Sequence, residues 1–315
     1  MRILFTADYH LKLGQKNVPK EWAKARYYEF FKQVHELEES VDLHIIGGDI
    51  FDRTPTLDEL KLFFEFIQDI IKPTWIYDGN HEATKKGQSF LHLISNIVRM
   101  INPNVLVITD TTDTGDFIIV PYTEIHKKGA FDLPAKPLFT HVRGEIPPHV
   151  KPEIDLDLLD KFPIVFAGDL HSHSNCQRNI IYPGSPMTTS FHRSEVKTGY
   201  IIIEDDWSWK WGEFKLPQLI RKTVDDPELM IPTEYHHTIY ELEGDSLDLS
   251  NVKANELLDK KLVKKSSEAR LVLNKNMTLR DELVEYLTYI LEIPEGKLLD
   301  IMGAFNDYSK NIEME

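Results

Sequence analysis

The chain has 315 residues, of which 42% are hydrophobic, and its formal net charge at pH 7 is −15. This length can bury one large core and carry a smaller module, whereas no apolar run approaches the roughly 20 residues that a membrane-spanning helix needs. The acidic balance argues against a chain that binds DNA unaided, because phosphate affinity usually comes from a surplus of Lys and Arg.

The N-terminal sequence MRILFTADYH lacks the basic segment and the following apolar segment of a signal peptide. The single cysteine, Cys176, excludes an intramolecular disulfide framework and fits a reducing compartment. We therefore expect a cytoplasmic protein without a membrane partner.

Short apolar runs that favour strands alternate with helical patterns through the first two thirds of the chain. The predicted strands span residues 2–6, 42–46, 74–77, 105–108, 117–122, 137–140, 164–167 and 199–204. Apolar residues at helical spacing predict helices over residues 20–37 and 57–71, between the first three strands. This order predicts an α/β fold, a layered β-sandwich flanked by helices.

The pattern loosens over residues 215–232, where three prolines interrupt it. We expect domain boundaries that give the sandwich residues 1–216, a smaller α+β cap residues 217–293 and a C-terminal helical element residues 294–315. Within the cap, the sequence predicts strands over 238–244 and 269–275 and a polar helix near 254–262. A further helix over 279–291 would be capped by Thr278.

Side chains that bind divalent cations follow five of the predicted strands. In chain order they are Asp8 and His10; Asp49 and Asp52; Asn80 and His81; His141; and Asp169, His171 and His173. Each group alone is ordinary turn chemistry, but five ligand-bearing turns in one consistent order are hard to obtain by chance. Because a two-metal site draws its oxygen and imidazole ligands from converging loops, the set predicts such a site.

The motifs DxH, GDxxD and GNHE, a lone histidine after a strand and a late acid-and-histidine cluster resemble those of calcineurin-like metallophosphoesterases. The segments ADYHLKLGQ, GGDIFDR and GDLHSHSNCQRNIIYPGSPMTTSF further resemble SbcD-type nuclease subunits, including versions encoded by large bacteriophages. The resemblance covers residues 1–205. Protein serine/threonine phosphatases carry an arginine directly before GNHE, where this chain has Asp78, which disfavours a monoester-binding arginine clamp.

The resemblance implies two Mn²⁺ ions, with Mg²⁺ as the alternative, and assigns their ligands. One metal would take Asp8, His10 and His171, the other Asn80, His141 and Asp169, with Asp49 bridging both. His81 would then act as the catalytic group that stabilises the transition state or protonates the leaving oxygen. Arg53 and Arg143 are candidate phosphate or DNA contacts, although both are equally well explained as surface arginines.

The last motif departs from the family, which usually has Gly-His-x-His. An ungapped alignment places Asp169 and His171 there, and a carboxylate is an acceptable ligand for manganese or magnesium. A shifted alignment would use His171 and His173 instead. We favour the ungapped alignment, but the alternation of residues 169, 171 and 173 leaves both open.

By this resemblance we expect a DNA exonuclease on duplex ends and an endonuclease on single strands or hairpins, acting in recombination, repair or replication. Its partner would be an SbcC-like ABC-type ATPase, gripped by the face of Leu298, Ile301 and Phe305 in the terminal helix. A homodimer is a further expectation, since relatives often dimerise through the helices after the first motifs. The alternatives are a nucleotide or phosphoprotein phosphatase with the same chemistry and a catalytically degenerate scaffold.

Overall fold

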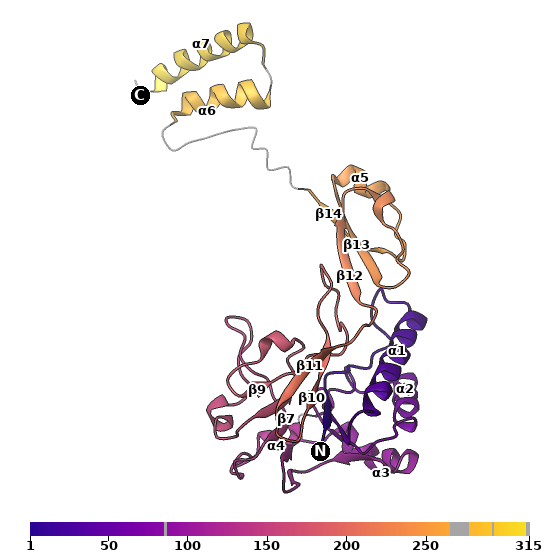
Figure 1. Cartoon of the computed structure of the whole chain (residues 1–315). Helices are drawn as coiled ribbons and strands as arrows, with labels where there is room; N and C mark the ends of the chain where they lie inside the picture. Colours follow the sequence, from indigo (N-terminus) through magenta and orange to yellow (C-terminus); the bar gives the residue numbers. More distant parts are fainter. Residues whose placement is uncertain (85–86, 265–276, 292, 313–315) are drawn as a thin grey trace. The chain divides into compact units, whose positions relative to one another are not determined.

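The computed structural model describes residues 1–84, 87–264, 277–291 and 293–312. They fall into two compact units, Met1–Glu243 with Val252–Lys261, and the described residues within Gly244–Asn251 and Leu262–Glu315 (Figure 1). Domain boundaries at residues 216/217 and 293/294 would mean that the parts on either side fold independently, and they stay a prediction. No helix in the described ranges combines the length and the apolar character needed to cross a bilayer.

The first unit is built on a six-stranded sheet with the order β11-β10-β1-β2-β3-β4. Its strands are β1 Ile3–Thr6, β2 Leu43–Gly47, β3 Thr74–Tyr77, β4 Val105–Ile108, β10 Gly199–Ile203 and β11 Trp209–Glu213. β1 to β4 are parallel, whereas β10 pairs antiparallel with β1 and β11 antiparallel with β10. The carboxyl ends of β1, β2 and β3 therefore meet at one edge of the sheet.

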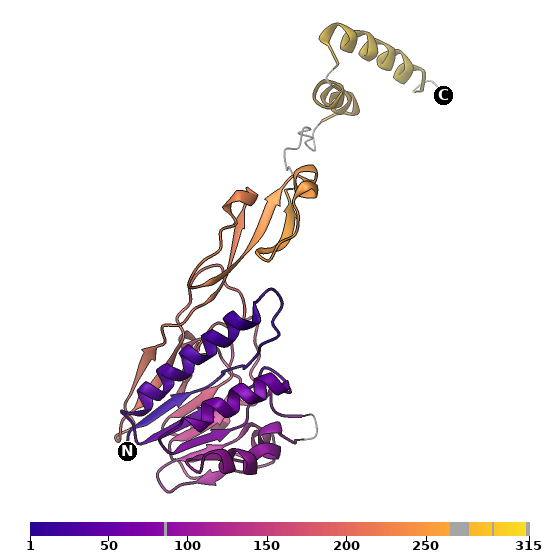
Figure 2. The ribbon, with the colours of Figure 1, turned by 90° about the vertical axis from the view of Figure 1, so that its right-hand side faces the viewer.

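Three helices cover one face of this sheet: α1 Lys20–Glu38, α2 Leu57–Gln68 and α3 Phe90–Ile101 (Figure 2). Leu4 and Ile46 of the sheet pack with Phe30 and Phe63 of the helices in one apolar cluster. Thr56 begins α2 with a capping box that satisfies free N–H groups of its first turn. The predictions of α1 and α2 are confirmed, whereas α3 was not predicted.

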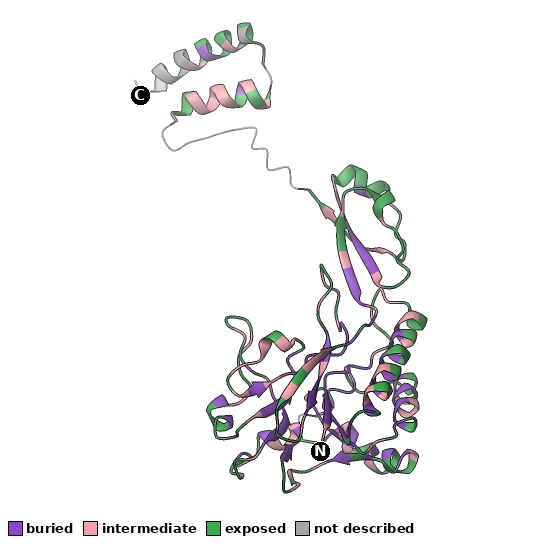
Figure 3. Cartoon of the chain, in the orientation of Figure 1, coloured by how far each residue is buried: buried purple, intermediate pink, exposed green. Residues whose placement is uncertain are grey.

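A second sheet packs on the other face of the first. It has the order β5-β6-β7-β8-β9, with β5 Thr112–Asp113, β6 Ile118–Val120, β7 Leu138–His141, β8 Val165–Gly168 and β9 Ile180–Ile181. Phe5 of β1 packs edge-on against Phe139 of β7 with ring centroids 5.4 Å apart, and both are buried. Buried residues concentrate along strands in the interior of this unit (Figure 3). Helix α4, Tyr122–Ile125, adjoins the outer core of this sheet. The predicted layered sandwich flanked by helices is confirmed.

The third sheet joins β12 Leu219–Val224, β13 His237–Gly244 and β14 Leu258–Val263 in that order. The polar helix predicted near residues 254–262 is therefore wrong, and the α-helix between β13 and β14, α5, spans Ser246–Asn251. The charges of β14 pair across the sheet: Lys260 Nζ lies 2.8 Å from Glu241 Oε1, and Asp259 Oδ2 lies 2.9 Å from Arg221 Nη2. Cross-strand ion pairs thus explain a charged sequence that resembled a solvated helix face.

The second unit contains α6 Leu279–Glu285, a π-helical turn Tyr286–Ile290 and α7 Glu295–Ile312. The helix predicted over 279–291 is confirmed, and Thr278 caps it by accepting a hydrogen bond from Asp281 N–H. Among the residues of these helices whose burial is described, Leu287 and Met302 are the buried apolar ones. The strand predicted over 269–275 lies outside the described residues.

Candidate metal centre

The candidate site lies where parallel strands of the two sandwich sheets end. Asp8, Asp49 and Asn80 follow β1, β2 and β3, while His141 ends β7 and Asp169 follows β8. Asp8, His10, Asp49 and Asp169 all have positive φ, between 46° and 101°. A left-handed backbone costs energy for residues other than glycine, and such positions cluster at functional sites.

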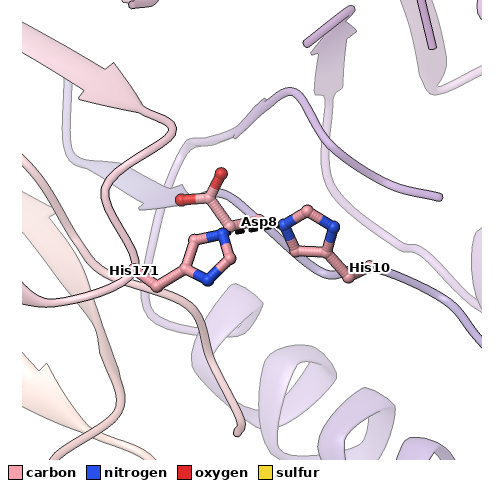
Figure 4. Close-up of side chains that lie close together, drawn as sticks. All are labelled: Asp8, His10 and His171. Atoms are coloured by element: carbon pink, nitrogen blue, oxygen red, sulfur yellow. Dashed lines mark hydrogen bonds between the residues drawn. The ribbon is translucent and has the colours of Figure 1, made fainter. Parts of the chain in front are cut away.

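One potential metal group consists of Asp8, His10 and His171, whose ligand atoms lie within 4.8 Å of one another (Figure 4). The two imidazoles face each other, with 2.9 Å between His10 Nε2 and His171 Nε2. Burial, followed by neighbouring imidazoles, lowers the pKa of His10 well below its usual value, and burial also lowers that of His171. Both rings are therefore neutral near pH 7 and can offer a lone pair to a cation.

Asp8 supplies an unsatisfied oxygen to the same group. Its Oδ1 accepts a hydrogen bond from Asp169 N–H at 3.0 Å, whereas its buried Oδ2 has no hydrogen-bond partner among the described residues. An unpaired buried carboxylate oxygen is costly unless a cation or donor meets it. The position of Asp8 Oδ2 therefore fits a metal ligand.

The carboxylate of Asp49 lies at the centre of the site. Its Oδ2 is 3.6 Å from His10 Nε2, 3.5 Å from His141 Nε2 and 3.9 Å from His81 Nε2. These three imidazoles come from the loops after β1 and β3 and from the end of β7. Asp49 also forms a second potential metal group with Asp8 and His141.

Asn80, His141 and Asp169 meet on the other side of Asp49. His141 Nδ1–H donates to Gly47 C=O at 2.8 Å, so that Nε2 points toward the Asn80 amide at 3.0 Å. The Asn80 amide oxygen faces only acceptors. When the amide is turned over, its nitrogen takes this place and lies 3.2 Å from Asp49 Oδ2 and 3.3 Å from Asp169 Oδ1. Without metal, the amide nitrogen would donate hydrogen bonds to these acceptors. With a cation between them, the amide oxygen and the carboxylate oxygens would all be ligands of the cation.

The charge of the site also calls for cations. Burial raises the pKa of Asp8 to about 8, even though His141 opposes the shift. Burial alone would lower the pKa of His141, but the carboxylates of Asp49, Asp8 and Asp169 raise it to about 9. Protons thus offset part of the carboxylate charge without metal, and divalent cations would take their place. The residues of this site fit two such ions.

Glu82 supports the loops that carry Asp49 and Asn80. Its buried carboxylate accepts hydrogen bonds from the N–H groups of Asp49, Phe51 and Gly79 at 3.0, 2.8 and 2.9 Å. Position 79 requires glycine, because a Cβ there would lie 2.2 Å from Asp49 Oδ1. The only sequence signal for this support is the glutamate that closes the GNHE motif.

His81 lies at the rim, with its side chain 36% exposed. Its backbone N–H donates to Asp49 Oδ1 at 3.0 Å, and its ring Nδ1–H donates to Asp52 C=O at 2.5 Å. The remaining nitrogen, Nε2, belongs to a third potential metal group with His10 and Asp49. Geometry therefore permits both the expected catalytic role and a ligand role for His81.

Arg143 contacts a predicted ligand. Its Nε and Nη2 each donate to the Asp169 carboxylate at 3.1 Å, and this pairing raises the pKa of the guanidinium. Such a bidentate pair fixes the orientation of the carboxylate. Arg53, in contrast, is about half exposed, and its Nη2 lies 4.0 Å from Glu59 Oε1.

His173 belongs to none of the metal groups found among the described residues. Its Nδ1–H donates to Tyr182 C=O at 2.7 Å, and its ring stacks on Trp211 with centroids 5.3 Å apart and planes at 20°. Asp169 lies in none of these groups either, but its Oδ1 is 3.9 Å from His141 Nε2, whereas the His173 ring contacts Tyr182 and Trp211. Asp169 and His171 therefore remain the expected pair. Asp78, before the GNHE motif, is buried and pairs with His92 Nε2 at 3.3 Å.

The chain is similar in sequence to known phosphoesterases and to a phage exonuclease subunit. Residues 1–161, which contain β1 to β7, match the family model described as calcineurin-like phosphoesterase. The sequence is 41% identical to the probable exonuclease subunit 1 of Escherichia phage T5, over 99% of each chain. It is also 25% identical to the putative phosphoesterase 244L of Invertebrate iridescent virus 6, over 72% of this chain and 83% of that one. The solved structure of TT1561 from Thermus thermophilus covers 67% of this chain and 98% of its own, with 14% identity and a TM-score of 0.43.

Proposed function

Because this chain belongs to the calcineurin-like phosphoesterase family, we propose that it is a Mn²⁺-dependent DNA nuclease, with Mg²⁺ as the alternative metal. It would act as an exonuclease on duplex ends and as an endonuclease on single strands or hairpins, in DNA recombination, repair or replication in the cytoplasm. The name of the phage T5 relative, an exonuclease subunit, supports the nuclease assignment. The resemblance to SbcD motifs supports the choice of metal, the endonuclease activity and the role in recombination, repair or replication.

The observation that carries this proposal is the convergence of three imidazole nitrogens within 3.9 Å of Asp49 Oδ2. We assign Asp8, His10 and His171 to one cation, Asn80, His141 and Asp169 to the other, and Asp49 to both. When bound, the two cations would polarise the phosphodiester and activate the attacking water. Glu82 and Arg143 hold the ligand loops in place.

His81 is the group we assign to the transition state. Its Nδ1–H is held by Asp52 C=O, so its Nε2 is the atom available to the substrate. From there it can carry a proton to the leaving oxygen or balance charge that develops on the phosphoryl group. Arg53 and Arg143 remain proposed phosphate contacts, although Arg143 would have to share its guanidinium with Asp169.

The second unit is the proposed binding element for an SbcC-like ABC-type ATPase. Leu299 is 71% exposed and Ile301 38%, whereas Leu298 and Phe305 of the face predicted from the sequence are half-buried. Exposed apolar residues on a helix can dock into a groove of a partner. A DNA-binding partner would also compensate for the net charge of −15.

We also retain the proposal of a homodimer. Leu93, Ile97 and Met100 lie at i, i+4 and i+7 on α3 and are 77%, 46% and 84% exposed. An apolar stripe of this kind on a surface helix supports association through α3. Measurement of the molar mass in solution tests it, with Ile97→Glu expected to yield the monomer.

One assay separates the proposed nuclease from its alternatives. Purified chain is freed of metal with chelator, then supplied with Mn²⁺ and tested on labelled duplex DNA, single-stranded DNA and 4-nitrophenyl phosphate. We expect DNA cleavage that depends on Mn²⁺ and exceeds monoester hydrolysis, because Asp78 replaces the arginine of monoesterases. Preference for the monoester would favour a phosphatase, and metal binding without any hydrolysis would favour a scaffold.

A further inference from the structure

A cavity of about 740 Å³ lies beside the metal centre, and apart from His171 its lining residues have no part in the mechanism described above. Its walls come from the loop after β8, the loop between β9 and β10, and Trp211 of β11. The volume falls within the range of small-molecule sites, roughly 300 to 1,000 Å³. His171 belongs both to this wall and to the first metal group, so the cavity adjoins the place where a phosphodiester would meet the metals.

The walls combine a rigid aromatic ring, apolar side chains and hydroxyl groups. Trp211 is held by its stacking on His173 and by its indole N–H, which donates to Pro183 C=O at 2.9 Å. Buried Met187 and Leu170 add apolar surface, while the hydroxyls come from short polar side chains such as Ser190 and Thr198. A nucleoside has a flat apolar face with polar edges, and such mixed walls suit both.

The charge of the cavity differs from that of the chain as a whole. Although the net charge is −15, none of the described residues that line the cavity is acidic. Lys197 and His192 both line it, and neither side chain has a hydrogen bond or ion pair with any described residue. An exposed lysine with no acidic partner is available to a phosphate.

We propose that this cavity receives the unpaired deoxynucleoside next to the scissile phosphate, with Lys197 contacting the following phosphate. The inference rests on the proposed nuclease function and specifies its substrate: a strand whose nucleotide at the cut has left the duplex. Single strands, hairpin loops and frayed ends meet this requirement without the unstacking that an intact duplex must undergo.

Val196→Trp tests the proposal by filling the cavity, since Val196 lines it and Gln218 holds its backbone through two hydrogen bonds. The measurement is the ratio of kcat/KM for a single-stranded oligonucleotide to that for bis(4-nitrophenyl) phosphate, a diester without nucleosides. We expect this ratio to fall roughly tenfold or more, mainly through KM, because base stacking is lost. The matched control is Leu158→Trp, at a site that is 48% exposed and outside the cavity, which should keep the wild-type ratio.

A ratio unchanged in Val196→Trp would overturn the inference while leaving the nuclease proposal intact. Wild type that hydrolyses neither substrate would instead refute the nuclease proposal, and this inference with it. A second measurement needs no folded variant: calorimetry of Mn²⁺-loaded wild type with dAMP and with inorganic phosphate. We expect dAMP to bind roughly tenfold more tightly, and equal affinities would overturn the inference. Tighter dAMP binding with an unchanged ratio would assign the cavity to free nucleotides and overturn its assignment to the DNA strand.

Discussion

Glu82 accepts a hydrogen bond from the backbone N–H of Asp49 at 3.0 Å and thereby joins the loops after β2 and β3. The same carboxylate accepts hydrogen bonds from the N–H groups of Phe51 and Gly79, so one side chain satisfies three backbone donors next to the metal centre. Its burial, more than the nearby charge of Asp49, raises the pKa of Glu82 to about 8. The position of Asp49, which we assign to both cations, therefore depends on a residue outside the potential metal groups found among the described residues.

Glu82→Gln should weaken Mn²⁺-dependent activity by about 10- to 100-fold, the usual cost of losing a partner that orients ligands. An amide offers one acceptor oxygen in place of two, so it cannot satisfy all three N–H groups. The measurement is a Mn²⁺ titration of DNA cleavage, with exposed Glu39→Gln as the matched control. Wild-type affinity for Mn²⁺ in Glu82→Gln would show that the three hydrogen bonds are dispensable.

Asp49→Ala should abolish metal binding and cleavage together, because this carboxylate is assigned to both cations. We expect a loss larger than the roughly 10- to 100-fold cost of removing a group that only orients ligands. Bound manganese is measured by elemental analysis alongside nuclease activity, and exposed Asp205→Ala serves as the control. A variant that keeps two bound ions would contradict the bridging role.

His81→Ser should keep metal and DNA binding but lose about 10²- to 10⁴-fold in cleavage rate, the usual contribution of general acid–base groups. The reason is that His81 Nε2 is 3.9 Å from Asp49 Oδ2 at the exposed rim of the site. Bound metal and single-turnover rate are measured on the same sample. Loss of a metal ion from this variant would instead make His81 a ligand, as its grouping with His10 and Asp49 allows.

The metal-free protein should lose stability as pH rises from 6.5 to 8.5. The folded-state pKa of His141, about 9, lies above its ordinary 6.5, and that of Asp8, about 8, lies above 3.8. The unfolded chain therefore binds fewer protons in this window, and rising pH favours unfolding. Mn²⁺ binds the deprotonated ligands, so the increase in Tm that it produces should grow with pH.

Thermal unfolding at several pH values, in EDTA and in Mn²⁺, measures both effects. In EDTA, the Tm of His141→Gln should fall less steeply with pH than that of the wild type, because the proton of His141 no longer contributes. A Tm in EDTA that rises between pH 6.5 and 8.5, or a Mn²⁺ effect that shrinks with pH, would contradict the assignment of these protons.

Leu299→Glu combined with Ile301→Glu should abolish co-purification with an SbcC-like ATPase while leaving intrinsic Mn²⁺-dependent cleavage unchanged. Both positions are exposed on α7, so charges there should disturb a partner surface more than the fold. Leu158→Glu in the first unit is the matched control, and truncation after Pro294 gives an independent test. An intact complex with the double variant would move the contact elsewhere.

Much of the sandwich could be predicted from the sequence because its causes are local. The predicted strands over residues 74–77 and 105–108 coincide with β3 and β4, where buried parallel strands appear as short apolar runs between turn residues. The convergence of the ligand-bearing turns can be predicted in the same way, since the carboxyl ends of parallel strands meet at one edge of the sheet. For β14 this reasoning failed, because the charges of Asp259 and Lys260 are satisfied by strands distant in sequence.

The details of the site depend on contacts that no local pattern encodes. His10 and His171 face each other across 161 residues of sequence, and Arg143 reaches Asp169 across 26. Sequence periodicity allows His173 as a ligand, whereas in the structure its ring stacks on Trp211 and donates a hydrogen bond to Tyr182. Chemical type and position after a strand show which residues can serve as ligands, and both are visible in the sequence. Tertiary packing decided which of them meet, because the direction of a buried side chain is set by neighbours from other parts of the chain.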